Sequence, residues 1–157
     1  MILVGPFVRG DGSWILETLF SLMLARPWGP STWAKYYSTL YPSIKPADFA
    51  GYTAALQANL KEHGRLESFK HMLRASKRAS EERLPLVNTP ALVLMGSKDP
   101  DFKNPESEAR WVAESLKASY RMIENAGHYP HAEMPEIVGP LMLSYIQSLP
   151  EPKYEAG

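Results

Sequence analysis

Cysteine is absent from this sequence of 157 residues. Its absence excludes a disulfide framework, a thiol nucleophile and a metal site built on thiolates. It also agrees with a reducing compartment, and we therefore expect a cytoplasmic protein.

An excess of charge of one sign is also lacking, because seventeen Lys and Arg residues balance seventeen Asp and Glu residues. Without a basic run, neither nucleic acid nor an anionic membrane is an expected partner. Long apolar runs are missing too: residues 14–25 form the longest, and it contains Glu17 and is too short to span a bilayer. The first residues have no basic segment and no small-residue cleavage site, so we expect no signal peptide.

Apolar residues nevertheless make up 45% of the chain, which favours one folded domain with a core. Residues 2–4 are an apolar run closed by Gly5-Pro6, which predicts a buried strand. The spacing then becomes helical over residues 13–80, where we expect about four helices, with apolar stripes at 33–40, 49–60 and 66–73. Gly64 is the expected stop of the helix over 49–60.

The second half of the sequence alternates between strand and helix patterns. Residues 91–95 form an unbroken apolar run, which is typical of a strand covered on both faces, and residues 119–123 predict another strand. Asn104-Pro105 marks a helix start between them, and residues 137–149 show the spacing of a final amphipathic helix. This order predicts a parallel sheet of three strands in an α/β fold.

Polar loops follow the strands over 91–95 and 119–123. Ligands gather at the carboxyl ends of strands in open parallel sheets, so these loops are the first place to look for a site. The first loop contains Asp99 and the second contains His128. Neighbouring strands lie only about 4.8 Å apart, so these two side chains can meet. A buried carboxylate would fix the imidazole tautomer for acid and base chemistry.

The two loops resemble those of the α/β-hydrolases. PALVLMGSKDPDF resembles the strand and acid loop of that family, and ENAGHYPHAEMPE resembles its histidine loop. The resemblance implies that Asp99 is the acid and His128 the base of a catalytic triad. It also implies that residues 1–12 hold the sixth strand of the hydrolase core, 13–84 a helical lid, 85–149 further core strands and helices, and 150–157 a flexible tail. The match covers almost the whole chain but only the C-terminal half of such an enzyme.

The nucleophile of that family is not found. It should precede both partners on a Gly-x-Ser-x-Gly type of elbow, and no such elbow occurs here. Ser13 follows a glycine, but it comes after the sixth strand, where the resemblance implies the lid entrance. We therefore expect a truncated hydrolase portion that lacks nucleophile and oxyanion hole and is inactive alone.

Other roles are open for these residues. Asp99 also fits the role of a turn aspartate whose side chain caps its own backbone. His128 also fits the role of a histidine whose hydrogen bonds are made within a surface loop. Asp101 is the second-choice acid, while Gly127 and Glu133 are expected to support the histidine loop. We expect no metal, since a histidine pair at 128 and 131 lacks a third ligand at fitting spacing, and no cofactor. His63 and His71 are expected to be solvated on helices.

The segment over 13–84 is rich in aromatic residues, which either pack its own core or line an apolar pocket. The candidates for pocket lining are Trp14, Trp28, Trp33 and Tyr37. A pocket of this kind would accept a small apolar substrate: an ester, an epoxide, a halide or a ring-cleavage product.

Two functions from different classes remain. In the first, an N-terminal half completes an esterase-like enzyme whose nucleophile is Ser or Asp. In the second, the chain is a non-catalytic, partner-binding module. The strand over 2–4 would then have an unpaired edge, and such an edge invites self-association into a homo-oligomer or pairing with a complementing segment.

Overall fold

The computed structural model describes residues 1–10 and 14–150, and for residues 14–17 the backbone alone. Three strands form a parallel sheet in the order β1-β2-β3: β1 (Ile2–Val4), β2 (Leu92–Gly96) and β3 (Ser119–Ile123). The three expected strands and their parallel pairing are thus confirmed. Because the strands are parallel, their carboxyl ends meet at one edge of the sheet, where both polar loops begin.

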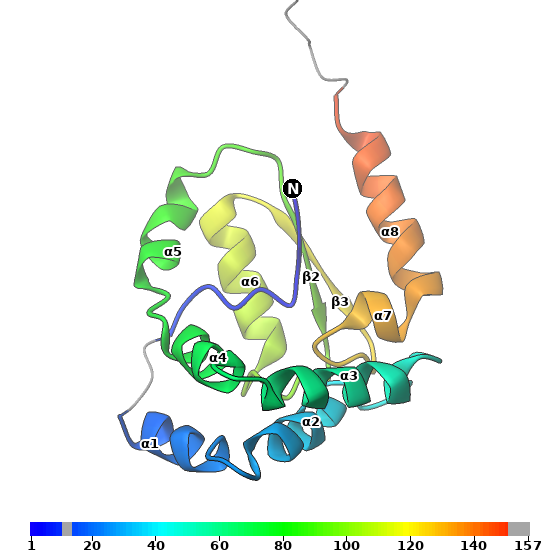
Figure 1. The fold of residues 1–157 in the computed structure, drawn as a ribbon. Coiled ribbons are helices and arrows are strands. Elements are labelled where there is room, and N and C mark those ends of the chain that lie inside the picture. The colour runs from blue at the N-terminus through cyan, green and yellow to red at the C-terminus, as the bar shows by residue number, and fades with distance from the viewer. Residues whose placement is uncertain (11–13, 151–157) are drawn as a thin grey trace, which may run out of the picture.

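The sheet is covered on both faces by helices from the second half of the chain (Figure 1). Alternate side chains of β2 point to opposite faces, as the pleat of a strand requires. Val93 and Met95 pack against α6 (Pro105–Leu116), whose inner residues Ala109, Val112, Ala113 and Leu116 are all buried. Leu92 and Leu94 pack on the other side, against α7 (Pro130–Glu133) and α8 (Pro135–Ser148).

The predicted start of α6 is confirmed in detail. Asn104 is its N-cap, and its side-chain oxygen accepts a hydrogen bond of 3.0 Å from the backbone N–H of Ser107. Pro105 occupies the first helical position, where its missing N–H costs nothing. The helix is therefore held at a fixed place beside the acid loop that precedes it.

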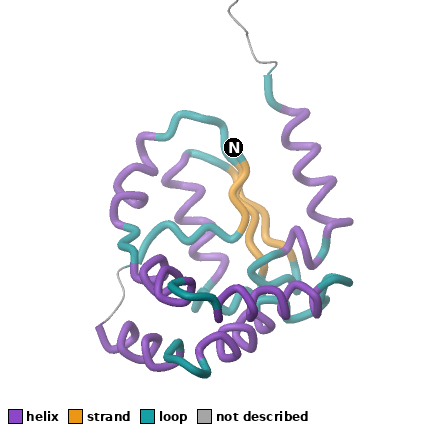
Figure 2. The backbone as a smooth tube through the Cα atoms, viewed as in Figure 1, coloured by secondary structure: helices purple, strands orange, loops and turns teal. Residues whose placement is uncertain are grey.

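Between β1 and β2 the chain is helical. Figure 1 shows that α1 to α4 lie across the carboxyl end of the sheet. Figure 2 shows the same separation, with the strands in one layer and the helical insert beyond their ends. The elements of this insert are α1 (Trp14–Met23), α2 (Gly29–Thr39), α3 (Phe49–Lys61), α4 (Arg65–Arg74), α5 (Arg78–Arg83) and the 3-10 turn η1 (Leu84–Leu86).

The insert departs from the prediction in two places. It has five α-helices in its described part rather than about four, and α5 was missed because none of its six residues is buried. Gly64 does not stop α3, which ends at Lys61; it has a φ of 77° and stands directly before α4. A left-handed backbone favours glycine there, so the residue marks the turn between two helices rather than the last turn of the first.

In the part of the chain that the structure describes, no helix combines the length and apolarity needed to cross a membrane. Ser13 and the tail from residue 151 onward lie outside the described residues.

Candidate functional site

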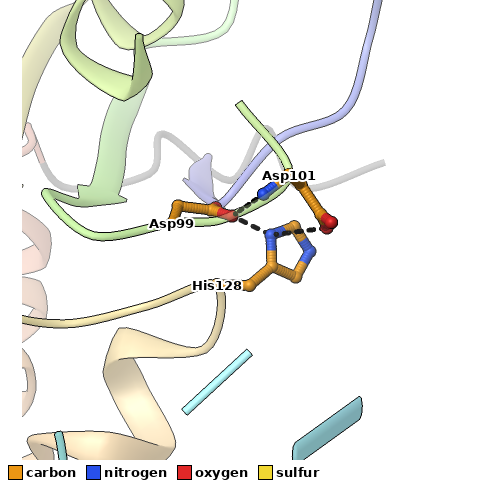
Figure 3. A group of neighbouring side chains, drawn as sticks. All are labelled: Asp99, Asp101 and His128. Atoms are coloured by element: carbon orange, nitrogen blue, oxygen red, sulfur yellow. Dashed lines mark hydrogen bonds and ion pairs between the residues drawn. The ribbon is translucent and has the colours of Figure 1, made fainter. Parts of the chain in front are cut away.

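Asp99 stands in the loop that leaves β2, and its side chain is completely buried. One carboxylate oxygen, Oδ1, accepts a hydrogen bond of 3.0 Å from the backbone N–H of Asp101. The other, Oδ2, lies 2.8 Å from Nδ1 of His128 (Figure 3). The turn therefore uses one oxygen of Asp99, as expected of a turn aspartate, and leaves the second for the imidazole.

His128 stands in the loop that leaves β3. Its backbone N–H donates a hydrogen bond of 3.0 Å to the carbonyl oxygen of Leu40, just after α2. Gly127 makes this contact sterically feasible, because a Cβ at that position would lie 2.2 Å from the same carbonyl oxygen. The histidine loop and the insert thus touch backbone to backbone at the residue that precedes His128.

Gly96 allows the two loops to approach one another. A Cβ on this residue would lie only 2.0 Å from the carbonyl oxygen of Gly127, a distance at which something must shift. The strand end that leads to Asp99 and the loop that carries His128 are therefore in direct backbone contact. This contact brings together the two residues that the sequence analysis paired.

Glu133 is 2% exposed and holds the histidine loop against the insert. Its Oε2 accepts a hydrogen bond of 2.6 Å from the N–H of Gly127. Its Oε1 accepts two more, of 2.6 Å from the N–H of Ser43 and of 3.0 Å from that of Ile44. One buried carboxylate thus binds three backbone donors from two segments that are distant in the sequence, and these contacts support the bracing role expected for Glu133.

Asp101 lies on the cavity side of the same imidazole. Its Oδ2 is 3.4 Å from Nδ1 of His128, and its Oδ1 accepts a hydrogen bond from the hydroxyl of Tyr36 on α2. Figure 3 shows both carboxylates directed at one ring nitrogen. Asp99 is closer and more deeply buried, and so it remains the better candidate for the acid, with Asp101 second.

The protonation of His128 follows from these neighbours. Burial lowers the pKa of the imidazole, but the hydrogen bond to Asp99 and the charges of Asp99 and Asp101 raise it, and the net effect is a pKa above the ordinary 6.5. An ionised carboxylate can only accept hydrogen bonds, so Nδ1 of His128 carries the proton that is donated to Asp99. In the neutral ring the free lone pair therefore lies on Nε2. A base with this tautomer can take a proton from a nucleophile placed beside Nε2.

The same three residues could also bind a metal ion, because Asp99, Asp101 and His128 can each offer one ligand atom within 4.8 Å of the others. In the structure, however, Nδ1 and Asp99 are separated by a hydrogen-bond distance of 2.8 Å. A metal would have to displace the shared proton. His131 is not part of this group, and its pKa is lowered by burial and by the nearby His128.

A cavity of about 860 Å³ opens between the insert and the ends of the strands. His128 and Asp101 lie in its wall, and most of the other lining residues are apolar or aromatic. The aromatic members are Phe7, Phe20, Trp33, Tyr36, Tyr37, Tyr52, Phe69 and Tyr129. Among the tyrosines, burial is the main reason why the pKa of Tyr129 is raised to about 12.

The candidates for pocket lining are only partly brought together. Trp33 and Tyr37 line the cavity. Trp28 does not: it is 54% exposed, and its indole N–H donates a hydrogen bond of 3.0 Å to the carbonyl of Leu22, which holds the ring on the outside of the insert. The side chain of Trp14 lies outside the described residues.

Several lining residues were not singled out from the sequence. Phe69 and Tyr129 lie in the wall, as do the basic residues Arg74 and Lys77. Tyr36, one of the aromatic residues of the segment over 13–84 that were expected to pack its core or line a pocket, also lies in the wall. His63 and His71 are exposed, His71 on α4 and His63 in the turn before that helix rather than on a helix as expected.

The sequence matches no protein-family model and no curated protein. Solved structures are similar to it in fold. An esterase from Exiguobacterium antarcticum has a TM-score of 0.72 at 18% identity, and the match covers 94% of this chain and 56% of the esterase. A bromoperoxidase from Bacillus anthracis has a TM-score of 0.71 at 13% identity, with 94% and 57% of the two chains covered. An α/β-hydrolase enzyme from a deep-sea metagenome library of the Medee basin has a TM-score of 0.61 at 18% identity, with 98% and 58% covered.

These similarities show the fold. The three strands, the helical insert and the covering helices form the C-terminal portion of an α/β-hydrolase fold. The chain spans about 56% of the length of the first of these structures. The sequence identities are low, so the chemistry of this chain has to be argued from its own residues.

Proposed function

We propose that this chain supplies the acid and the base of a hydrolase, with Asp99 as the acid and His128 as the base. The observation that carries the proposal is the hydrogen bond of 2.8 Å between Asp99 Oδ2 and His128 Nδ1, made by a fully buried carboxylate beside a large apolar cavity. An aspartate that only capped a turn would not have to bind a histidine. A histidine that only completed a surface loop would not have to pair with a buried carboxylate in a cavity wall.

The nucleophile and the oxyanion hole would come from an N-terminal half that the chain does not include. If the nucleophile is serine, Nε2 of His128 takes its proton during attack on the acyl carbon and then donates that proton to the leaving group. If it is aspartate, His128 instead activates the water that hydrolyses the covalent ester. In both cases Asp99 holds the ring in one tautomer and stabilises the imidazolium.

The substrate would be a small, largely apolar molecule, such as an ester or an epoxide. The cavity supports this because aromatic rings from the insert, which would act as the lid, surround the space beside His128. Tyr37 contacts Tyr41, Phe49, Tyr52 and Tyr129 with ring centroids 5.4 to 5.9 Å apart, so the wall is packed rather than loose. No metal or other cofactor is part of this proposal.

The experiment is ester hydrolysis by a completed protein. The segment encoded directly upstream in the gene is joined to the chain, and hydrolysis of a short nitrophenyl ester is measured. We expect activity that falls by about three orders of magnitude or more in His128→Ala. His63→Ala is the matched control, because His63 is an exposed histidine away from the cavity, and it should retain full activity.

The chain without that segment should hydrolyse the ester no faster than its His128→Ala variant does. Activity of the chain alone that depends on His128 would show that it contains its own nucleophile and would contradict the proposal.

A partner-binding module remains the second candidate, and one observation favours it. Among the described residues β1 pairs only with β2, so its other edge carries backbone groups that can pair with a further strand. Size-exclusion chromatography tests this candidate. Concentration-dependent dimers that disappear when a proline replaces Val4, whose backbone N–H points to the free edge, would support self-association through β1, and a stable monomer would contradict it.

A further inference from the structure

The cavity beside His128 has two basic side chains, Arg74 and Lys77, in a wall that is mostly aromatic and aliphatic. Arg74 ends α4, and Lys77 stands three residues on, directly before α5. The ammonium group of Lys77 lies 4.7 Å from the centroid of the Phe7 ring, and the guanidinium of Arg74 donates a hydrogen bond to the hydroxyl of Ser21. Both contacts are to neutral partners.

Neither residue has a carboxylate within ion-pair distance in the described part of the chain. Five basic residues outside the cavity do have a glutamate within 2.7 to 3.3 Å: Arg9 with Glu108, Arg65 with Glu62, Lys70 with Glu67, Arg78 with Glu82, and Arg110 with Glu106. Two positive charges that no described carboxylate balances, beside a largely apolar cavity, are suited to an anionic ligand, because an apolar surround weakens screening by water.

Negative charge lies in the part of the cavity wall that contains His128. Asp101 lies in the cavity wall with its carboxylate beside the imidazole, and the buried Asp99 lies behind it. An anionic group would be repelled from this end and attracted to the end formed by Arg74 and Lys77. Aromatic rings lie between the two charges: the Phe7 ring is 4.7 Å from the Lys77 ammonium and 5.3 Å from the Phe102 ring, which is 6.5 Å from the imidazole of His128.

We infer that the cavity binds an organic carboxylate with an apolar or aromatic body, whose carboxylate is held by Lys77 and Arg74 while the rest of the molecule extends over the aromatic wall toward His128. The inference rests on the proposed function in one respect: the bond to be hydrolysed would be the one that lies at His128, at the uncharged end of the ligand. The recognised substrate class is thus an ester or a related compound that also carries a free carboxylate.

The test is a binding measurement on the chain as it exists. Phenylhexanoate and its neutral isostere phenylhexanamide are titrated into the protein by calorimetry near neutral pH and at low salt. We expect the acid to bind about fivefold more tightly than the amide, as one solvent-accessible ion pair allows. The difference should shrink as salt is added, while the affinity for the amide stays the same.

The variant that tests the assignment combines Arg74→Met and Lys77→Met. It should bind the acid no more tightly than the amide and keep the amide affinity of the natural chain, which shows that the cavity is intact. Arg78→Met is the matched control, since Arg78 is exposed, lies outside the cavity and pairs with Glu82. It should keep the preference for the acid.

Equal affinities of the natural chain for acid and amide, or binding of neither, would overturn the inference. The salt dependence of the natural chain decides the matter even if the double variant fails to fold. These binding outcomes do not test the pairing of Asp99 with His128, which is tested separately by ester hydrolysis. Conversely, a completed protein without His128-dependent activity would leave the preference for carboxylates standing.

Discussion

The sheet and the helical insert are built on different principles. In the sheet, β2 is buried along its whole length, and its side chains fill two apolar clusters, one on each face. In the insert, α1 to α5 contribute few fully buried residues, and many of their aromatic rings face a cavity. The first region is stabilised by close packing, whereas the second leaves room for a ligand.

The two regions meet at the candidate site. Hydrogen bonds cross between them in the described part of the chain: the N–H of His128 to the carbonyl of Leu40, Glu133 to the N–H groups of Ser43 and Ile44, the hydroxyl of Ser43 to the carbonyl of Asn125, and the hydroxyl of Tyr36 to Asp101. Each contact involves the histidine loop or the acid loop. The position of the insert and the geometry of the site are therefore coupled.

The largest expected effect comes from breaking this connection at Glu133. Glu133→Ala would leave three backbone donors without their carboxylate and should destabilise the protein by about 4 kcal/mol. Urea unfolding checks this value. Glu136→Ala is the control, since Glu136 is exposed in the first turn of α8, and it should cost less than about 1 kcal/mol. A loss as small as the control's would mean that the insert is held by other contacts.

A comparison of two leucines tests the difference in packing. Leu94 is completely buried in the sheet, and Leu94→Ala should cost about 3 kcal/mol because it leaves a new void. Leu56 lies in the wall of the existing cavity, so Leu56→Ala mainly enlarges that space and should cost about 1 kcal/mol. Chemical unfolding of both variants measures the difference, and equal losses would show that the insert is packed as tightly as the sheet.

The titration of His128 tests the site at which the sheet and the helical insert meet. Its pKa is raised above 6.5 by the two aspartates, so the folded protein binds this proton more tightly than the unfolded chain. The protonation of His128 therefore stabilises the folded protein fully when the pH lies below the pKa of His128 in the unfolded chain. This stabilisation is lost as the pH rises through the pKa of His128 in the folded protein. Titration by NMR should show a smaller shift in Asp101→Asn and a reversed one in Asp99→Asn. An unchanged pKa in Asp99→Asn would contradict the pairing.

The smallest effect on stability is expected on the outside of the insert. Trp28→Phe should change the free energy of unfolding by less than about 0.5 kcal/mol, since the ring is largely exposed.

Trp33 lies in the cavity wall and packs on Phe69 at 4.5 Å between centroids. The change in tryptophan fluorescence on binding of phenylhexanamide should therefore persist in Trp28→Phe and largely vanish in Trp33→Phe. The reverse result would place the ligand outside this cavity.

The sequence was most informative where the signals are local. The limits of β3 and the cap of α6 could be predicted because an apolar run, an asparagine and a proline act on their immediate neighbours. The approach of Asp99 to His128 could be predicted because parallel strands bring their loops together. Local signals were enough for the sheet and for the core of the site.

The insert could not be predicted in the same detail, since its contacts are long-range. Glu133 and Ser43 are separated by 90 positions, and no local pattern links them. Trp28 and Trp33 are only five positions apart, yet one faces solvent and the other the cavity. The helix α5 has no apolar stripe, because it buries none of its residues. Arg74 and Lys77 lie in the cavity wall because of the tertiary fold, and no local pattern predicts their place there.

The central claim is that Asp99, rather than its neighbour Asp101, is the acid that serves His128. The most direct measurement compares Asp99→Asn and Asp101→Asn in the completed protein by their rates of nitrophenyl ester hydrolysis. The account predicts a loss of about four orders of magnitude for Asp99→Asn, because the imidazole would be held in the wrong tautomer, and of less than about tenfold for Asp101→Asn, whose oxygen stands farther away at 3.4 Å. A larger loss in Asp101→Asn than in Asp99→Asn would contradict it.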